Sequence, residues 1–168
     1  MPELNLSTEN VVTKNILNPV RLEGQTEQYI DLDKYPWPLS SDHFDKVIAE
    51  NLLQRINDVL SIMGEIYRVS KQGAKIYIVV PWYSSSSAAT DYRNVHLFNF
   101  TTFDFLLNEL EKEGKKFKLI KIEAIPHKEF KWIPNFKIPF LTRRSRDILS
   151  TFIGEINQYV YAELETQK

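Results

Sequence analysis

The most constraining feature of the sequence is the run Lys75-Ile-Tyr-Ile-Val-Val-Pro81, in which every residue between the lysine and the proline is apolar or aromatic. A short, nearly continuous apolar run is typical of a strand at the centre of a parallel sheet, where both faces are covered. Before this run, apolar residues recur at steps of three and four from Leu52 to Tyr67, which predicts a helix that Gly73 ends. A helix that leads directly into a buried strand indicates an α/β fold.

Shorter segments continue the alternation of strands and helices. We expect further strands at residues 4–6, 20–23, 29–32, 46–49, 117–125 and 158–165, the last of them antiparallel. A second helix is predicted with Thr101 and Asp104 as its capping box and Gly114 at its end, and a third around residues 142–153.

The predicted fold class is α/β: a Rossmann-like, mostly parallel sheet with helices on both faces, an antiparallel C-terminal strand and a shortened N-terminal part. The N-terminal part is short because the connection from Glu23 to Tyr29 has too few residues for a crossover helix. Either that connection is a loop, or the N-terminal edge of the sheet is rearranged. We expect residues 1–168 to form one domain, with residues 126–157 inserted between the last two strands.

Composition excludes several classes of function. The chain has no cysteine, which excludes disulfides, thiolate zinc sites and cysteine nucleophiles and favours a reducing, cytoplasmic location. With only three histidines and no carboxylates spaced to join them, no metal site is predicted. No apolar run is long enough to span a membrane, and the N-terminal residues do not have the pattern of a secretory signal.

Positive charge is concentrated in one segment, although basic and acidic residues nearly balance over the whole chain, 21 against 22. Residues 115–146 hold ten basic side chains and two carboxylates, with five aromatic residues between them. This pattern can hold a nucleic acid or a phosphorylated substrate, with Trp132 stacking and Arg143, Arg144 and Arg146 binding phosphate. The alternative is a solvated face that balances the acidic N-terminal half.

Several motifs occur in a fixed order between residues 29 and 105. They are D-L-D-K-Y-P-W-P at 31–38, S-S-D-H-F-D-K-V at 40–47, G-E-I-Y-R-V-S-K-Q-G at 64–73, V-P-W-Y-S-S at 80–85, and an outline of D-x-x-H-x-x-x-F-x-x-x-T-F from Asp91 to Phe103. In this order they resemble the class I S-adenosylmethionine-dependent methyltransferase superfamily, specifically its type 11 members. The resemblance implies S-adenosylmethionine as the cofactor.

The resemblance also implies which residues bind the cofactor. Glu23 matches the acidic residue that binds the ribose hydroxyls, and Asp31 matches the residue that contacts the adenine, followed by Leu32. Ser7 and Thr8 stand at the turn after the first strand, and Asn51 follows the fourth strand. Asp91 and His96 are candidates for positioning or deprotonating the methyl acceptor, and the alternative for them is a loop hydrogen bond and a partly buried histidine.

The sequence departs from the family pattern at functional positions. Relatives read L-N-L-G-C-G at the first strand, whereas this chain reads L-N-L-S-T-E from Leu4, so the glycines that let backbone approach the cofactor are missing. Relatives read H-V-L-E-H-I after the fourth strand, and here residues 51–56 read N-L-L-Q-R-I. Asn94 replaces the histidine of the D-x-x-H element. Two functions therefore stay open: a methyltransferase of unknown acceptor, and a non-catalytic relative that acts as a binding or assembly module.

Overall fold

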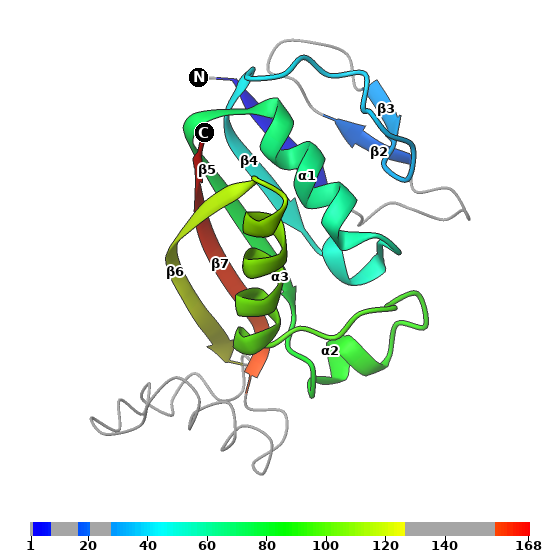
Figure 1. Ribbon diagram of the computed structural model, residues 1–168. Coiled ribbons are helices and arrows are strands. Elements are labelled where there is room, and N and C mark those ends of the chain that lie inside the picture. The colour runs from blue at the N-terminus through cyan, green and yellow to red at the C-terminus, as the bar shows by residue number, and fades with distance from the viewer. Residues whose placement is uncertain (1, 8–16, 21–27, 127–156) are drawn as a thin grey trace.

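A computed structural model describes residues 2–7, 17–20, 28–126 and 157–168 of the chain. Five strands form one sheet in the order β1-β4-β5-β7-β6 (Figure 1). Their bounds are Glu3–Ser7 for β1, Phe44–Glu50 for β4, Ser70–Pro81 for β5, Lys116–Pro126 for β6 and Asn157–Gln167 for β7. The β1–β4 and β4–β5 pairs are parallel, and β7 is antiparallel to both of its neighbours. The predicted α/β class, with a mostly parallel sheet and an antiparallel C-terminal strand, is confirmed.

The strands at the N-terminal edge differ from the prediction. β2 (Leu17–Val20) and β3 (Gln28–Asp31) form a separate antiparallel pair, so the expected parallel strands at 20–23 and 29–32 are wrong. The physical reason is the short connection between them, because a parallel pair needs a crossover of a dozen or more residues. Of the two possibilities that the sequence left open, the rearranged edge is the one observed.

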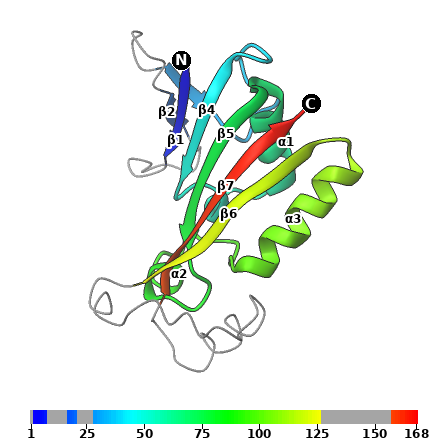
Figure 2. The same cartoon turned by 90° about the vertical axis from the view of Figure 1, so that its left-hand side faces the viewer.

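Both long helices lie on the same face of the sheet (Figure 2). They are α1 (Val59–Val69) and α3 (Phe100–Lys112), and the short elements η1 (Leu53–Arg55) and α2 (Ser86–Ala89) precede α1 and α3 respectively. Buried aliphatic side chains of β1, β4, β5 and β7 face them, such as Leu6, Ala49, Ile78 and Ala162. On the opposite face the alternating side chains of β5, Tyr77 and Val79, are only half-buried. The sequence predicted helices over both faces of the sheet. Within the described ranges, both long helices cover one face only.

The helix ends differ from the prediction because polar side chains fix them. Asp58 caps α1 by accepting from the backbone N–H of Ser61, so the helix begins seven residues after Leu52. Gly73 does not end α1, because it lies within β5 with a φ of 75°. Asn99 and Thr102 form the capping box of α3, in place of Thr101 and Asp104. No helix in the described ranges is long and apolar enough to cross a membrane.

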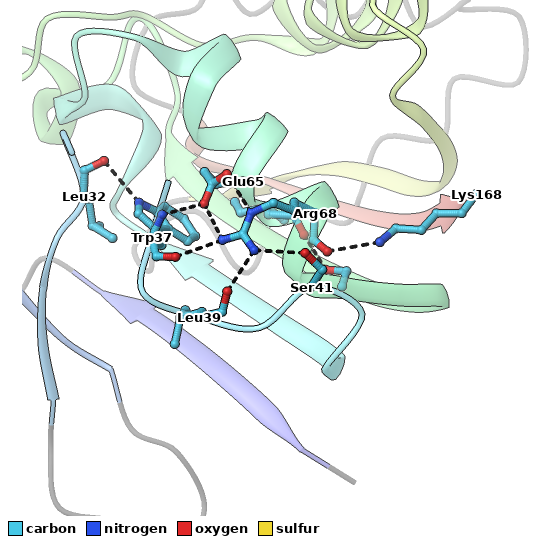
Figure 3. A network of polar contacts seen from close by, with 9 residues as sticks. Leu32, Trp37, Leu39, Ser41, Glu65, Arg68 and Lys168 are labelled. Carbon is cyan, nitrogen blue, oxygen red and sulfur yellow. Dashed lines mark hydrogen bonds and ion pairs between the residues drawn. The ribbon is translucent and has the colours of Figure 1, made fainter. Parts of the chain in front are cut away.

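Arg68 on α1 fastens the loop after β3 to the helix (Figure 3). Its guanidinium donates to both carboxylate oxygens of Glu65, at 2.9 and 2.7 Å. The same group donates to the backbone carbonyls of Trp37 (3.0 Å) and Leu39 (2.8 Å) and to the hydroxyl of Ser41 (3.1 Å). One side chain thus joins the D-L-D-K-Y-P-W-P and G-E-I-Y-R-V motifs, and we call this group the Arg68 clamp.

Glu65 completes the clamp from the buried side. Its Oε2 accepts from the backbone N–H of Trp37 at 2.8 Å, and the Trp37 indole is 2% exposed. Burial of Glu65 raises its pKa, but the hydrogen bonds from Arg68 and Trp37 outweigh burial and the net pKa is lowered. Glu65 is therefore ionised at neutral pH and holds both the loop backbone and the arginine.

Replacing Arg68 with alanine should destabilise the fold by about 3 kcal/mol, because it leaves a buried carboxylate and two loop carbonyls without their donor. The measurement is the free energy of unfolding from urea denaturation. Lys112→Ala is the matched control: Lys112 and Glu109 have the same i,i+3 spacing, but their side chains are 69% and 52% exposed. That control should lose less than about 1 kcal/mol. Equal losses in the two variants would contradict the role of the clamp.

Candidate functional site

A cleft of about 470 Å³ opens at the carboxyl ends of β4 and β5, where β7 begins. It is lined by Asn51, Gln54, Arg55, Pro81, Ser87, Asp91, Asn94 and Tyr159. Most of these side chains are polar. Because open parallel sheets place their ligand crevices outside the carboxyl ends of the strands, this cleft is the candidate functional site.

Asn51 turns the chain out of β4 into the wall of the cleft. Its φ is 51°, in the left-handed region that asparagine tolerates better than most residues. Its backbone N–H donates to the carbonyl of Val79 on β5 at 2.9 Å, which continues the strand pairing for one residue. The backbone therefore enters η1 directly at the edge of the cleft.

Gln54 and Asn94 come from two walls of the cleft that hydrogen bonds hold together. The Gln54 carbonyl accepts from the backbone N–H groups of Val95 (2.8 Å) and His96 (3.1 Å). The Asn94 amide donates to the carbonyls of Ser87 and Ala88, at 3.3 and 3.0 Å. The side-chain oxygens of Gln54 and Asn94 are both buried without a hydrogen-bond partner.

Asp91 lies in the cleft between two arginines. Arg55 donates to its Oδ2 at 2.8 Å, and Arg93 donates to both oxygens, also at 2.8 Å. The hydrogen bonds from Arg93, with the charge of Arg55 added, hold the pKa of Asp91 far below its ordinary value although burial opposes them. A carboxylate with so low a pKa is a weak proton acceptor, so the geometry favours positioning of Arg55 over removal of a proton.

His96, the second candidate catalytic residue, is not among the side chains that line the cleft. Its Nε2 lies 3.2 Å from the backbone carbonyl of Asn57. A carbonyl only accepts, so this nitrogen carries the hydrogen. His96 is partly buried and its contact is to backbone, which agrees with the alternative of a partly buried histidine.

The predicted cofactor residues are only partly described. Ser7 at the end of β1 pairs in register with Glu50 at the end of β4, so Ser7 and Asn51 belong to neighbouring strand ends. Asp31 accepts from the backbone N–H of Asp33 (3.2 Å) and pairs with Lys34 (3.1 Å). Leu32 is fully buried, and its backbone carbonyl accepts from the indole N–H of Trp37. Thr8 and Glu23 lie outside the described residues.

Glu23 and Asp31 were expected at the carboxyl ends of two parallel strands, but β2 and β3 form an antiparallel hairpin. Asp31 pairs with Leu17 at one end of the hairpin, whereas Val20 and Gln28, which flank the connection carrying Glu23, pair at the other end. Two parallel strands would have brought both acidic residues to one edge. The roles of Glu23 and Asp31 in cofactor binding stay predictions.

Most of the basic segment also falls outside the described residues. Trp132, Arg143, Arg144 and Arg146 lie there, as do the predicted helix at 142–153 and nearly all of the insertion at 126–157. In the described part, Lys115, Lys116 and Lys121 each pair with a glutamate. These three contacts agree with the solvated-face alternative. The interaction of this segment with nucleic acid or phosphate stays a prediction.

The chain is similar to one protein family and to several solved structures. Residues 5–78 match a family model described as a methyltransferase domain. No curated protein matches the sequence. A putative methyltransferase from Bacillus halodurans has a similar structure, with 15% identity and a TM-score of 0.50 over 82% of this chain and 70% of that chain.

Two further structures have the same fold. One is a putative methyltransferase solved with the Haloferax volcanii Trm112 methyltransferase activator, with 13% identity, a TM-score of 0.53, and coverage of 82% of this chain and 59% of that chain. The other is SpnF, described as a [4+2]-cyclase, with 14% identity, a TM-score of 0.51, and coverage of 83% of this chain and 56% of that chain. At these identities the similarity shows the fold, which hosts more than one reaction.

Six of the eight residues that line the cleft were not expected as site residues: Gln54, Arg55, Pro81, Ser87, Asn94 and Tyr159. Of these, Gln54, Arg55 and Asn94 stand where the sequence departs from the family pattern. For Gln54 and Arg55 a second signal was available, because positions that follow the carboxyl end of β4 lie at the ligand crevice. The convergence of Gln54 and Asn94 was not predictable, since about 40 residues separate them in the sequence.

Replacing Asn51 with glycine and with alanine should separate its backbone role from its side-chain role. Both variants lose the amide side chain, but only glycine adopts the left-handed conformation without strain. We expect the alanine variant to be less stable than the glycine variant by about 1 kcal/mol. Thermal unfolding of the two variants side by side measures the difference. Equal stability would mean that the turn at Asn51 is not held in this conformation.

Proposed function

We propose that this chain, whose fold and whose sequence over residues 5–78 are those of the class I methyltransferase superfamily, transfers a methyl group from S-adenosylmethionine to a small polar acceptor. The observation that carries the proposal is the position of the cleft. It lies at the carboxyl ends of β4 and β5, one strand away from the end of β1, where the cofactor is expected. Acceptor and cofactor would then share one edge of the sheet.

The described residues fit part of a cofactor site. Ser7 and Asn51 stand at neighbouring strand ends, and Asp31 keeps the carboxylate that the resemblance assigns to the adenine. The side chain of Asp31 is 19% exposed, so part of it is accessible to a ligand. Leu32 is fully buried, so it would support the site from behind.

The cofactor, when bound, supplies an electrophilic methyl group on a sulfonium. The protein's own task is then to place the acceptor in line with that group, which needs orientation more than covalent chemistry. Arg55 and Asp91 both line the cleft and form an ion pair, with side chains 16% and 20% exposed. Since Asp91 is a weak base, the acceptor should be a group that attacks without first losing a proton to it.

The alternative function is a non-catalytic module that keeps the fold for binding or assembly. Two observations favour it: the first turn has no glycine, and an antiparallel hairpin replaces the two expected parallel strands. The similarity to a [4+2]-cyclase also cautions against equating this fold with methyl transfer. Cofactor binding distinguishes the two functions.

Isothermal titration of the full chain with S-adenosylhomocysteine and with S-adenosylmethionine tests the proposal. We expect saturable heat with one site per chain for both ligands. Asp31→Ala should weaken binding by about 1–3 kcal/mol, the cost of leaving a ligand group without its partner.

Asp33→Ala is the matched control, because it removes an exposed carboxylate of the same charge two residues away. It should leave affinity nearly unchanged. No heat from either ligand at millimolar concentration would overturn the proposal in favour of the non-catalytic module. Equal weakening in both variants would mean that Asp31 acts only through its charge.

A further inference from the structure

Two arginines share one carboxylate at the cleft. The Nη2 atoms of Arg55 and Arg93 both lie 2.8 Å from Oδ2 of Asp91, and Nε of Arg93 lies 2.8 Å from Oδ1. Both guanidinium groups are always charged in proteins, and the low pKa of Asp91 keeps that carboxyl ionised at neutral pH. Two positive charges are therefore held close together around a single negative charge, and the group of three side chains is positive overall.

Partial burial makes this imbalance matter. The side chains of Arg55 and Asp91 are 16% and 20% exposed, and that of Arg93 is 43% exposed. Charges that are partly removed from water interact more strongly than charges on an open surface, because the effective dielectric constant is lower. Since one carboxylate offsets the repulsion between two guanidinium groups only in part, a second anion in the cleft lowers the energy of the group.

The hydrogen-bond acceptors of the cleft wall are not available to a ligand. The side-chain oxygens of Gln54 and Asn94 are buried, so they do not accept from a molecule in the cleft. Both oxygens of Asp91 already accept from arginines. A ligand whose only polar groups are N–H donors would therefore find few partners here.

The wall does carry hydrogen-bond donors. Arg55 lines the cleft, and its guanidinium has five N–H donors on three nitrogens, one of which, Nη2, binds Asp91. Ser87 and Tyr159 also line the cleft and carry hydroxyl groups. The Ser87 hydroxyl oxygen accepts from Nε2 of Gln158 at 3.4 Å, and a hydroxyl that accepts still has its own hydrogen to donate. A molecule in this cleft thus meets donors and positive charge.

We propose that the cleft binds a small carboxylate and that Arg55 is the residue that holds it. A carboxylate fits better than a phosphate dianion, because one negative charge balances the excess of one positive charge on Arg55, Arg93 and Asp91. The planar guanidinium also matches the two oxygens of a carboxylate. This inference rests on the proposed function in so far as the ligand is the methyl acceptor, which then carries a carboxylate group. Binding of the anion itself requires only the cleft.

The test uses three small probes on the ¹⁵N-labelled full chain, at constant ionic strength and with no cofactor added. Acetate carries the carboxylate, inorganic phosphate carries an anion of higher charge, and methylammonium carries a positive charge with N–H donors. The readouts are the chemical shifts of the Arg55 Nε–H group and of the Ser87 backbone amide. We expect saturable shifts with acetate at millimolar concentration, weaker binding of phosphate, and no saturable shift with methylammonium.

Variants of the charged group should change acetate binding in opposite directions. Arg55→Gln removes a positive charge and should weaken acetate binding about tenfold, followed at Ser87. Asp91→Asn keeps an oxygen that accepts from an arginine but removes the negative charge, so it should tighten acetate binding about threefold. If Arg55 and Asp91 had only a structural role, the Asp91→Asn variant would not gain affinity, and that result would contradict the inference.

Lys112→Gln is the matched control for the loss of one positive charge. The Lys112 side chain is 69% exposed on α3 and does not line the cleft. This variant should bind acetate as the wild type does. An equal weakening in Lys112→Gln and Arg55→Gln would mean that acetate responds to the overall charge of the chain and not to the cleft.

Four results with the wild type would overturn the inference, and they stand even if a variant fails to fold. They are shifts of equal size with methylammonium, no shift with acetate, tighter binding of phosphate than of acetate, and displacement of acetate by S-adenosylhomocysteine. Displacement would assign the anion site to the carboxylate of the cofactor. If acetate binds while S-adenosylhomocysteine gives no heat, the proposed function fails and this inference holds. Heat from S-adenosylhomocysteine without any acetate shift has the reverse meaning.

Discussion

The parallel pairing of β1, β4 and β5 is the constraint on which the rest of the structure depends. In register, Leu6 lies beside Ala49 and Ala49 beside Ile78, and all three side chains are fully buried under α1 and α3. Parallel pairing sends the carboxyl ends of the three strands to one edge. That edge holds Ser7, Asn51 and Pro81, so the candidate site follows from the direction of the strands.

The Arg68 clamp provides the second constraint. In the part of the chain that the structure describes, β2 and β3 form a sheet of their own, so the loop that follows β3 needs another anchor. Arg68 and Glu65 supply it through the backbone of Trp37 and Leu39. The motifs that carry the family resemblance at 31–38 and 64–73 are thus in contact, and their residues in this clamp serve the fold rather than the chemistry.

The sequence predicted the main sheet well because each of its strands is marked by local pattern. The apolar run at 76–80 and the alternation at 158–165 each identify a strand from neighbouring residues alone. Pairing partners are not local, so the hairpin of β2 and β3 was mistaken for two parallel strands. The start of α1 was also misjudged, because Leu52 and Ile56 are buried outside the helix and mimic its periodicity.

The site was predictable only where a strand end carries it. Asn51 was expected from its place after β4, and Asp91 from the motif that contains it. The meeting of Gln54 and Asn94 depends on backbone hydrogen bonds between η1 and the segment after α2, which no spacing rule contains. Mutual positions of distant polar residues are set by tertiary hydrogen bonds, and those appear only in the folded chain.

The central claim is that the ligand edge is the one formed by the carboxyl ends of β1, β4 and β5. Backbone amide shifts of the ¹⁵N-labelled chain during titration with S-adenosylhomocysteine test it most directly. The account predicts the largest shifts at Ser7, Glu50 and Asn51, and none at Gly73 and Gly114, which lie at the opposite edge of the sheet. Shifts centred on Gly73 and Gly114, or a spectrum that does not change, would contradict it.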